Sequence, residues 1–193
     1  PVSYQLFETL MLSIAAATNS GFGQSDEPEA VVSSTHAKTT RRGRDTNYWL
    51  RRIDTHRQEE AVQALVRLGP SAIAELISLG KSYFKLKPTL QHALLNFEST
   101  EMLLQLSDHD NPFVRAQTLA LLVELASDSA AVSDAIWSSL GDDDFAVRVV
   151  AVQGIRKCVR DKPDVSALVH LVKNDPSDSI RTEARLALQE ICP

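Results

Sequence analysis

The residues that could do chemistry in this chain do not assemble into a recognisable catalytic motif. Its five histidines, at positions 36, 56, 92, 109 and 170, include no pair at helical spacing. A zinc protease needs an HExxH motif, a serine hydrolase GxSxG and a P-loop enzyme a glycine-rich phosphate loop, and the sequence contains none of these. We therefore predict that the chain is not an enzyme and that it has neither catalytic residues nor a cofactor.

Two acidic clusters could in principle hold a cation, but their spacing favours turns. One cluster is the run from Asp142 to Asp144, and in the other Asp108 and Asp110 flank His109. An EF-hand loop needs alternating oxygen ligands and a later glutamate, and neither cluster supplies them. Because acids also cap and stabilise the N-terminus of a helix, we interpret both clusters as capping turns and predict no metal site.

A third cluster combines basic and aromatic residues, as nucleic-acid surfaces can. It comprises Lys81, Tyr83, Phe84, Lys85 and Lys87. The alternative is that this segment is an ordinary inter-repeat loop whose aromatic rings point inward.

The charge of the chain is unevenly distributed along the sequence. The net charge of −5 divides into −4 over residues 1–35, +6 over 36–87 and −7 over 88–193. An acidic chain is a poor general binder of nucleic acid, because phosphate contacts need clustered lysine and arginine. We therefore regard nucleic acid as the less favoured partner, with residues 41–87 as the segment that would bind it.

A pattern that recurs every 33 residues predicts the helices that position these residues. Val114-Arg115, Val147-Arg148 and Ile180-Arg181 stand at that interval, and each pair opens an apolar stripe with helical spacing. The stripes continue through Thr118, Leu121, Leu122 and Leu125, then Ala151, Gly154, Ile155 and Cys158, then Ala184, Ala187, Leu188 and Ile191. Such a period indicates stacked helix pairs, so the predicted fold is all-α, an α-solenoid.

Each predicted repeat has a first helix, called the A helix, and a second, called the B helix. We place the solenoid at residues 47–193, with about four to five repeats by their usual length. Earlier helices are expected near 47–53, 57–68, 71–79, 88–97 and 100–106, with an irregular segment at 81–87. Asn111-Pro112 and Asp175-Pro176 each place a capping residue before a helix-opening proline. Whether the solenoid continues beyond Pro193 is left open.

Residues 1–46 form a separate N-terminal segment. An apolar run within residues 6–23 is too short to span a membrane, and fits either a secretory signal remnant or a helix that caps the solenoid. Residues 24–45 lack apolar periodicity and are expected to be a disordered linker. A cytoplasmic location is favoured, and export remains open if the run is a signal remnant.

The segments 110–122, 143–155 and 176–188 share an acidic turn, a Val-Arg or Ile-Arg pair, a small residue and then a Leu or Ile. In this pattern the chain resembles HEAT-like repeats of the phycobilisome-lyase type. The resemblance implies an α-solenoid that binds other proteins, or alternatively an accessory subunit or domain of an enzyme. Some HEAT-like proteins are di-iron hydroxylases that depend on His-Glu pairs, and no such pair occurs here.

Two columns of equivalent residues have a predicted role. Arg115, Arg148 and Arg181 follow buried branched residues, and we expect their guanidinium groups to join repeats by meeting turn acids such as Asp110, Asp143 or Asp178, or helix-end carbonyls. Leu104, Trp137 and His170 stand at equivalent positions of successive B helices, just off the buried stripe. A core column is expected to hold residues of similar size and polarity, and leucine, tryptophan and histidine differ in both. Tryptophan is also a frequent binding anchor. We predict that this second column forms a ridge on the concave face and contacts a protein partner. The alternative is that Trp137 wedges between repeats and His170 ends its helix in solvent. The identity of the partner and the oligomeric state cannot be read from the sequence.

Overall fold

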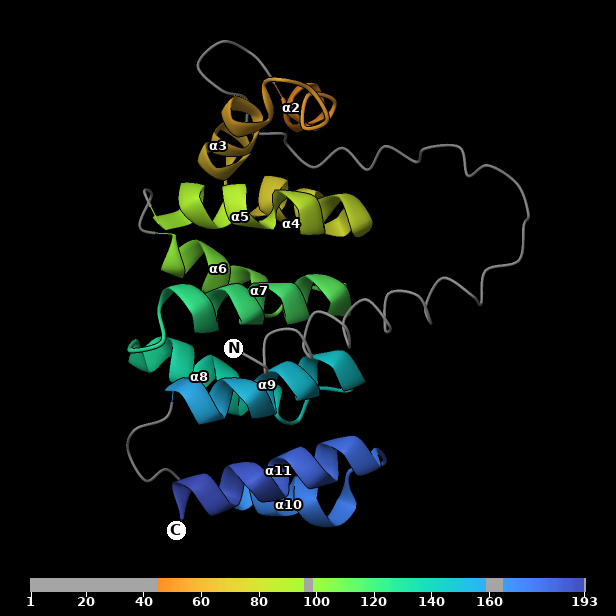
Figure 1. Cartoon of the computed structure of the whole chain (residues 1–193), viewed down its shortest axis with the longest axis vertical. Coiled ribbons are helices and arrows are strands. Elements are labelled where there is room, and N and C mark those ends of the chain that lie inside the picture. Colours follow the sequence, from red (N-terminus) through yellow and green to blue (C-terminus); the bar gives the residue numbers. More distant parts are fainter. Residues whose placement is uncertain (1–44, 96–98, 159–164, 193) are drawn as a thin grey trace, which may run out of the picture. The chain divides into compact units, whose positions relative to one another are not determined.

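The computed structural model describes residues 45–95, 99–158 and 165–192, and within these ranges all regular structure is helical. The helices are α2 (Thr46–Leu50), α3 (Gln58–Leu68), α4 (Pro70–Ser78), α5 (Lys81–Leu95), α6 (Thr100–Leu106), α7 (Pro112–Leu125), α8 (Ala130–Ser139), α9 (Phe145–Cys158), α10 (Ser166–Asn174) and α11 (Asp178–Ile191) (Figure 1). No strand occurs among the described residues, so the predicted all-α class is confirmed. Residues 1–44 of the predicted N-terminal segment lie outside the described residues, and its last residue, Thr46, is the first of α2.

The 33-residue period of the sequence is also the period of the structure. Helices α7, α9 and α11 are each 14 residues long and begin at Pro112, Phe145 and Asp178. Helices α3 and α5 precede them as A helices, and α4, α6, α8 and α10 are the B helices. The repeats predicted from the Val-Arg pairs are therefore present as helix pairs, as an α-solenoid requires.

The helices pack in two layers (Figure 1). In the A layer α3 contacts α5, α5 contacts α7, α7 contacts α9 and α9 contacts α11. In the B layer α4 contacts α6 and α6 contacts α8. The layers are joined mainly by contacts of a B helix with the A helix that follows it: α6 with α7, α8 with α9, and α10 with α11. Each repeat therefore buries its apolar stripe against its neighbours.

The core lies between the layers and is built from the predicted columns. Val114, Val147 and Ile180 are at most 1% exposed, and the small column Thr118, Ala151 and Ala184 is completely buried. Cys158 is also buried, as its place in an apolar column predicted.

One position of the core leaves little room for a side chain larger than that of glycine. A Cβ on Gly154 would lie 3.0 Å from Val123 Cγ2 and 3.3 Å from two carbon atoms of Ile136. Gly154 therefore allows α9 to approach both α7 and α8 closely.

The helix ends agree with the sequence at two turns and differ at a third. Asn111 caps α7 through its side chain, which accepts a hydrogen bond from Phe113 N, and Gly69 ends α3 with φ +104° before Pro70 opens α4. Asp175 was expected to cap α11, but it is the C-terminal cap of α10. The residue that caps α11 is Ser177, whose hydroxyl accepts from Ile180 N.

The prediction of an irregular segment at residues 81–87 was wrong. Helix α5 runs without a break from Lys81 to Leu95 and contains Pro88 in its interior. Proline is unfavourable there because it lacks an N–H group and crowds the preceding turn. Burial offsets that cost: Tyr83, Leu86 and Leu90 are at most 3% exposed, so tertiary packing overrides the local signal.

Candidate protein-binding surface

The predicted contact column lies on three B helices and is neither core nor fully solvated. Leu104 on α6 and Trp137 on α8 are half-buried, and His170 on α10 is exposed. Their neighbours Leu103, Ile136 and Leu168 are at most 1% exposed. The column therefore borders the core on its outer side. Helices α6 and α8 are in contact, whereas α10 packs on α11, so a continuous surface from Trp137 to His170 stays a prediction.

Trp137 carries a polar group that its surroundings do not satisfy. Its indole Nε1 is buried and has no hydrogen-bond partner within the described structure, although the ring as a whole is half-buried. The ring thus packs on its repeat with one edge and leaves another edge accessible. Such a divided environment is typical of tryptophan at interfaces, which supplies a large rigid apolar area.

The arginine column joins successive repeats by one recurring geometry. Arg115 donates through Nε and NH2 to the carboxylate of Asp142 at 2.8 and 2.7 Å, and Arg148 contacts Asp175 in the same way at 2.8 and 3.4 Å. Each pair is separated by 27 residues, so it connects an A helix to the turn before the next A helix. We call this arrangement the arginine ladder.

The third nitrogen of each guanidinium, NH1, binds the turn before its own helix. Arg115 NH1 donates to the carbonyls of His109 and Asp110, and Arg148 NH1 to those of Asp142 and Asp143, at 2.9 to 3.1 Å. The acceptors at Asp110 and Asp143 are thus main-chain oxygens and not the carboxylates that the sequence suggested.

The last arginine of the ladder differs from the other two. Arg181 binds the carbonyl of Asp175 and the carboxylate of Asp178, three residues before it. The Asp178 contact agrees with the prediction from the sequence.

The acids of the ladder are themselves held in place. Asp142 Oδ1 accepts from Asp144 N, and Asp175 Oδ1 accepts from Ser177 N, both at 2.8 Å. Burial raises the pKa of Asp142, but the hydrogen bonds from Arg115 and Asp144 and the charges of Arg115 and Arg148 outweigh it and lower the pKa overall. The ladder thus binds the ionised form of its acid. The role of these contacts in stability is a prediction for substitution to test.

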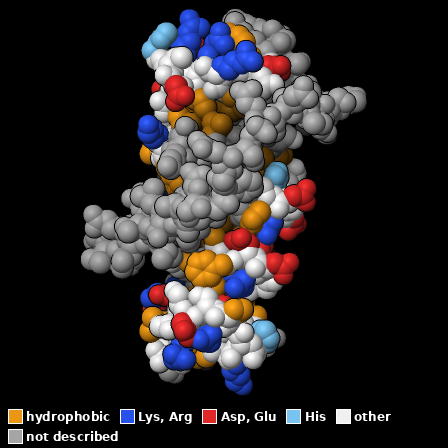
Figure 2. All heavy atoms as spheres, turned by 90° about the vertical axis from the view of Figure 1, so that its right-hand side faces the viewer, with side chains coloured by type: hydrophobic (Ala, Val, Ile, Leu, Met, Phe, Trp, Pro, Cys, Tyr) orange, Lys and Arg blue, Asp and Glu red, His pale blue; other side chains and the backbone are white. Residues whose placement is uncertain are grey.

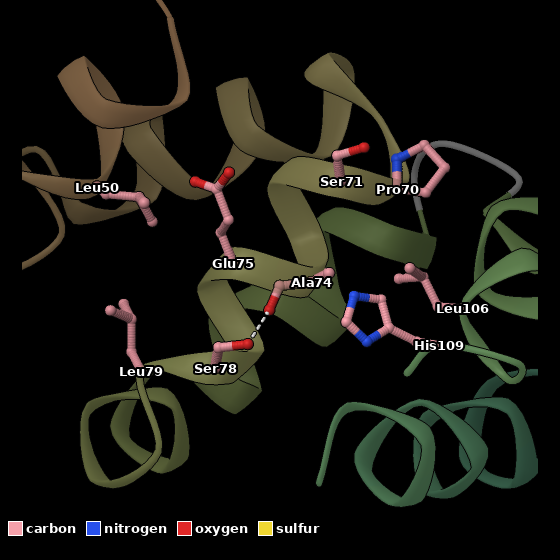
Figure 3. A pocket seen from close by; sticks show the side chains of 9 residues that line it. All are labelled: Leu50, Pro70, Ser71, Ala74, Glu75, Ser78, Leu79, Leu106 and His109. Atoms are coloured by element: carbon pink, nitrogen blue, oxygen red, sulfur yellow. Dashed lines mark hydrogen bonds between the residues drawn. The ribbon is translucent and has the colours of Figure 1, made fainter. Parts of the chain in front are cut away.

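His109 occupies the ladder's acidic column, since it stands 33 residues before Asp142 and 66 before Asp175. Its Nδ1 accepts from Asn111 N at 3.0 Å, the same turn contact that Asp142 and Asp175 make. No arginine reaches His109 from the preceding repeat, because the position 27 residues before it is Ser82. The imidazole instead borders a groove (Figure 3).

This groove, which we call the α4 groove, has a volume of about 570 Å³. Its floor is one face of α4, formed by Ser71, Ala74, Glu75 and Ser78 at the spacing of successive helical turns. Leu50, Leu79 and Leu106 add apolar walls, and Figure 3 shows Glu75 and His109 on opposite sides of Ala74. The sequence analysis missed this groove. The signals were the polar face of α4 and the histidine in an otherwise acidic column.

Glu75 is the charged group of the groove, and its side chain is exposed to solvent. Partial burial raises the pKa of its carboxyl, and the nearby charge of Asp45 raises this pKa further. Asp45 Oδ1 accepts from Tyr48 N, which holds it at the start of α2. No lysine or arginine is among the described residues that line the groove. Arg52, two residues after Leu50, stacks over the Tyr48 ring and donates to the Tyr48 carbonyl.

The basic and aromatic cluster of α5 is largely engaged within the fold. Tyr83 is completely buried, which raises the pKa of its hydroxyl, and Lys87 forms an ion pair with Glu124 at 3.0 Å. Phe84 packs near Tyr83 and Phe113, with ring centroids 5.6 and 6.2 Å away. An aromatic ring so buried cannot stack on a base, so the inward packing expected as the alternative describes Tyr83.

Charged side chains of both signs cover the surface. On the face shown in Figure 2, basic side chains gather at the α2–α3 end, and acidic and basic side chains lie next to each other towards the other end. No group of acidic, histidine and cysteine side chains within the described residues could hold a metal ion. None of the described helices is long and apolar enough to cross a membrane.

The paired helices, their period and the ladder define a class of protein, the α-solenoids built from helical repeats. Residues 100–189, which include the B helices α6, α8 and α10 and most of their A helices, match the family model of HEAT repeats. This match supports a HEAT-like repeat protein, as the sequence pattern predicted. HEAT repeats generally mediate protein–protein interactions, and the family is typically non-catalytic. No curated protein matches the sequence. The finer resemblance to the phycobilisome-lyase type stays a prediction.

Proposed function

We propose that this chain is a non-catalytic protein-interaction module, a scaffold or assembly factor, that binds its partner along the outer side of the B helices. The observation that carries this proposal is the column Leu104, Trp137 and His170, which stays partly or fully accessible at equivalent places on three B helices. The neighbouring positions on the same helices are core. Accessible unlike residues at regular spacing suit recognition of an irregular partner surface better than they suit packing.

Trp137 is the expected anchor of this surface. A few residues usually dominate the binding energy of an interface, and tryptophan is enriched among them. Its half-buried ring is already fixed by the fold, so less side-chain freedom is lost when a partner covers it. The exposed His170 would lie at the rim, where single contacts contribute less.

The test begins with affinity capture from the native source and identification of the captured proteins by mass spectrometry. The binding of an identified partner is then measured for the full chain and for Trp137→Ala, which we expect to weaken it by about tenfold or more. Thermal unfolding followed by circular dichroism shows whether that variant remains folded. Because Trp137 is half-buried, His170→Ala serves as a second variant that leaves the core untouched.

The expected control is Ser138→Ala, a change to an exposed residue beside Trp137 that should leave binding unchanged. The proposal is overturned if Trp137→Ala and His170→Ala both bind the partner as tightly as the original chain. It also fails if Trp137→Ala mainly unfolds the protein and His170→Ala has no effect on binding, because Trp137 would then be part of the core.

A further inference from the structure

The α4 groove contains a carboxylate, Glu75, that forms no ion pair with a basic residue of the described structure. Other acids with which the described basic residues pair include Glu124, Asp142, Asp175 and Glu190. Glu75 has no such partner among the described residues, and the like charge of Asp45 raises the pKa of its carboxyl. Because the two carboxylates repel each other beside an apolar wall, a positive charge bound next to them would lower their electrostatic energy.

The walls of the groove are apolar and favour an apolar group of a partner. Leu79 is 39% exposed and is one of few large hydrophobic side chains so exposed in the described structure. Leu50 also lines the groove on the side of Glu75, and Leu106 lines it on the side of His109 (Figure 3). The volume of about 570 Å³ falls in the usual range of ligand sites, so the groove has room for several side chains of a partner.

The third feature is a hydrogen-bond donor opposite the carboxylate. Because His109 Nδ1 accepts from Asn111 N, a neutral imidazole carries its proton on Nε2. Figure 3 shows the ring of His109 directed towards the groove, across Ala74 from Glu75. A donor, an apolar floor and an acceptor in this order match a short stretch of polypeptide with a carbonyl, an apolar side chain and a cationic side chain.

We propose that the α4 groove binds a segment of a partner protein that places a lysine or arginine beside Glu75 and an apolar side chain between Leu50 and Leu79. The cation relieves the repulsion between Glu75 and Asp45, and His109 donates to a main-chain carbonyl of the segment. This inference rests on the proposed function, since it assigns a chemistry to one part of the B-helix side. It is independent of Trp137, because none of the groove residues belongs to α8.

The test uses random peptides of about twelve residues displayed on phage and selected on the full chain, a length sufficient for a groove-binding segment. The enriched sequence is then synthesised with a fluorescent label, and its binding is measured by anisotropy. We expect the selected peptides to combine lysine or arginine with leucine-like residues. Replacing the basic residue by glutamine, or Glu75→Gln in the protein, should each weaken binding by about tenfold, and both changes together by little more.

The matched control is Glu101→Gln, which removes an exposed glutamate of α6 outside the groove and should leave peptide binding unchanged. Leu79→Ser should also weaken binding, because it removes part of the apolar wall. The proposal is overturned if no peptide is enriched, if the enriched peptides lack basic residues, or if Glu75→Gln binds them as tightly as the original chain. A partner whose binding depends on Trp137 but not on Glu75 would leave the proposed function standing and overturn only the groove.

Discussion

The part of the chain from α7 to α11 and the part from α2 to α6 are built from the same kind of helix pair but are held together differently. In the first part the A helices have equal length, and arginines of the ladder join each repeat to the next. In the second part the A helices are 11 and 15 residues long, one contains an internal proline, and no ladder arginine is present. The regular part closes its turns, whereas the irregular part leaves the α4 groove open.

His109 marks the boundary between the two parts. Its side chain makes the turn contact of the ladder's acids, yet no guanidinium covers it, so its other nitrogen is left to face the groove. Where the arginine–aspartate pair of the ladder is absent, a structural position such as that of His109 can become a candidate recognition position. In repeat proteins each unit contacts only its neighbours, so such a change can be tolerated locally.

The difference between the two parts is tested most directly by asking whether the ladder stabilises the regular part. Arg148→Ala should lower the free energy of unfolding by about 3 kcal/mol, because it leaves the buried carboxylate of Asp175 without its partner. Urea unfolding followed by circular dichroism measures this loss. The side chain of Asp175 is only 1% exposed, which makes this the largest effect expected here.

Arg156→Ala is the control for the ladder. Arg156 also joins two A helices, through Glu183 and Glu190, but its side chain is 36% exposed. Exposed ion pairs contribute about 0 to 1 kcal/mol, so this variant should be much less affected than Arg148→Ala. If the two variants lose equal stability, burial of the ladder is not what distinguishes it.

Sequence reasoning succeeded in the regular part because one physical signal repeats there three times. The apolar stripes, the small column and the helix starts share one interval, so errors at one repeat are corrected by the others. The signal could not reveal which acids the arginines meet, because Asp142 and Asp175 stand 27 residues after their partners. Such a contact depends on how the repeats stack, which local periodicity does not encode.

In the irregular part, Pro88 led to the wrong prediction of an irregular segment before it. The sequence also gave no direct indication of the α4 groove. A proline predicts a helix start or a break from local preferences alone, whereas α5 persists because its apolar face is buried on both sides of that residue. The groove is formed by side chains from α2, α4, α6 and the turn before α7, together with Leu79 directly after α4. Residues so far apart in the sequence are brought together only by the fold.

The second prediction concerns the irregular part. Pro88→Ala should raise the free energy of unfolding by about 1 to 2 kcal/mol, because alanine restores an N–H group and removes the crowding of the preceding turn inside α5. Pro88 is exposed, so alanine leaves no cavity in the core. Urea unfolding and amide hydrogen exchange of α5 both measure the change.

Pro112→Ala is the matched control, because Pro112 is the first residue of α7, where proline fits the helix and its missing N–H is not needed. That variant should therefore change the free energy of unfolding by less than about 0.5 kcal/mol. A loss of stability in Pro88→Ala would mean that the proline supports α5 and that the irregular part is adapted to it.

The third and smallest effect tests the charge of the ladder through pH. Because the folded protein lowers the pKa of Asp142, ionisation of this acid stabilises the fold at pH values above its unfolded pKa, which is about 3.9. This contribution should disappear as the pH falls through the lower pKa of the folded state. Asp142→Asn should therefore lower the free energy of unfolding by about 1 kcal/mol near pH 7, and by progressively less below about pH 4.

The unfolding of the original chain and of Asp142→Asn is compared from neutral to acidic pH. Asp143→Asn is the control, because Asp143 is exposed and uses its carbonyl, not its carboxylate, to accept from Arg148. A difference between Asp142→Asn and the original chain that stays constant to the lowest pH would show that asparagine disturbs the turn itself. In that case the geometry of the turn, and not the charge facing Arg115, is what the regular part requires; His109 makes the equivalent turn contact, with Asn111 N, without a charged partner.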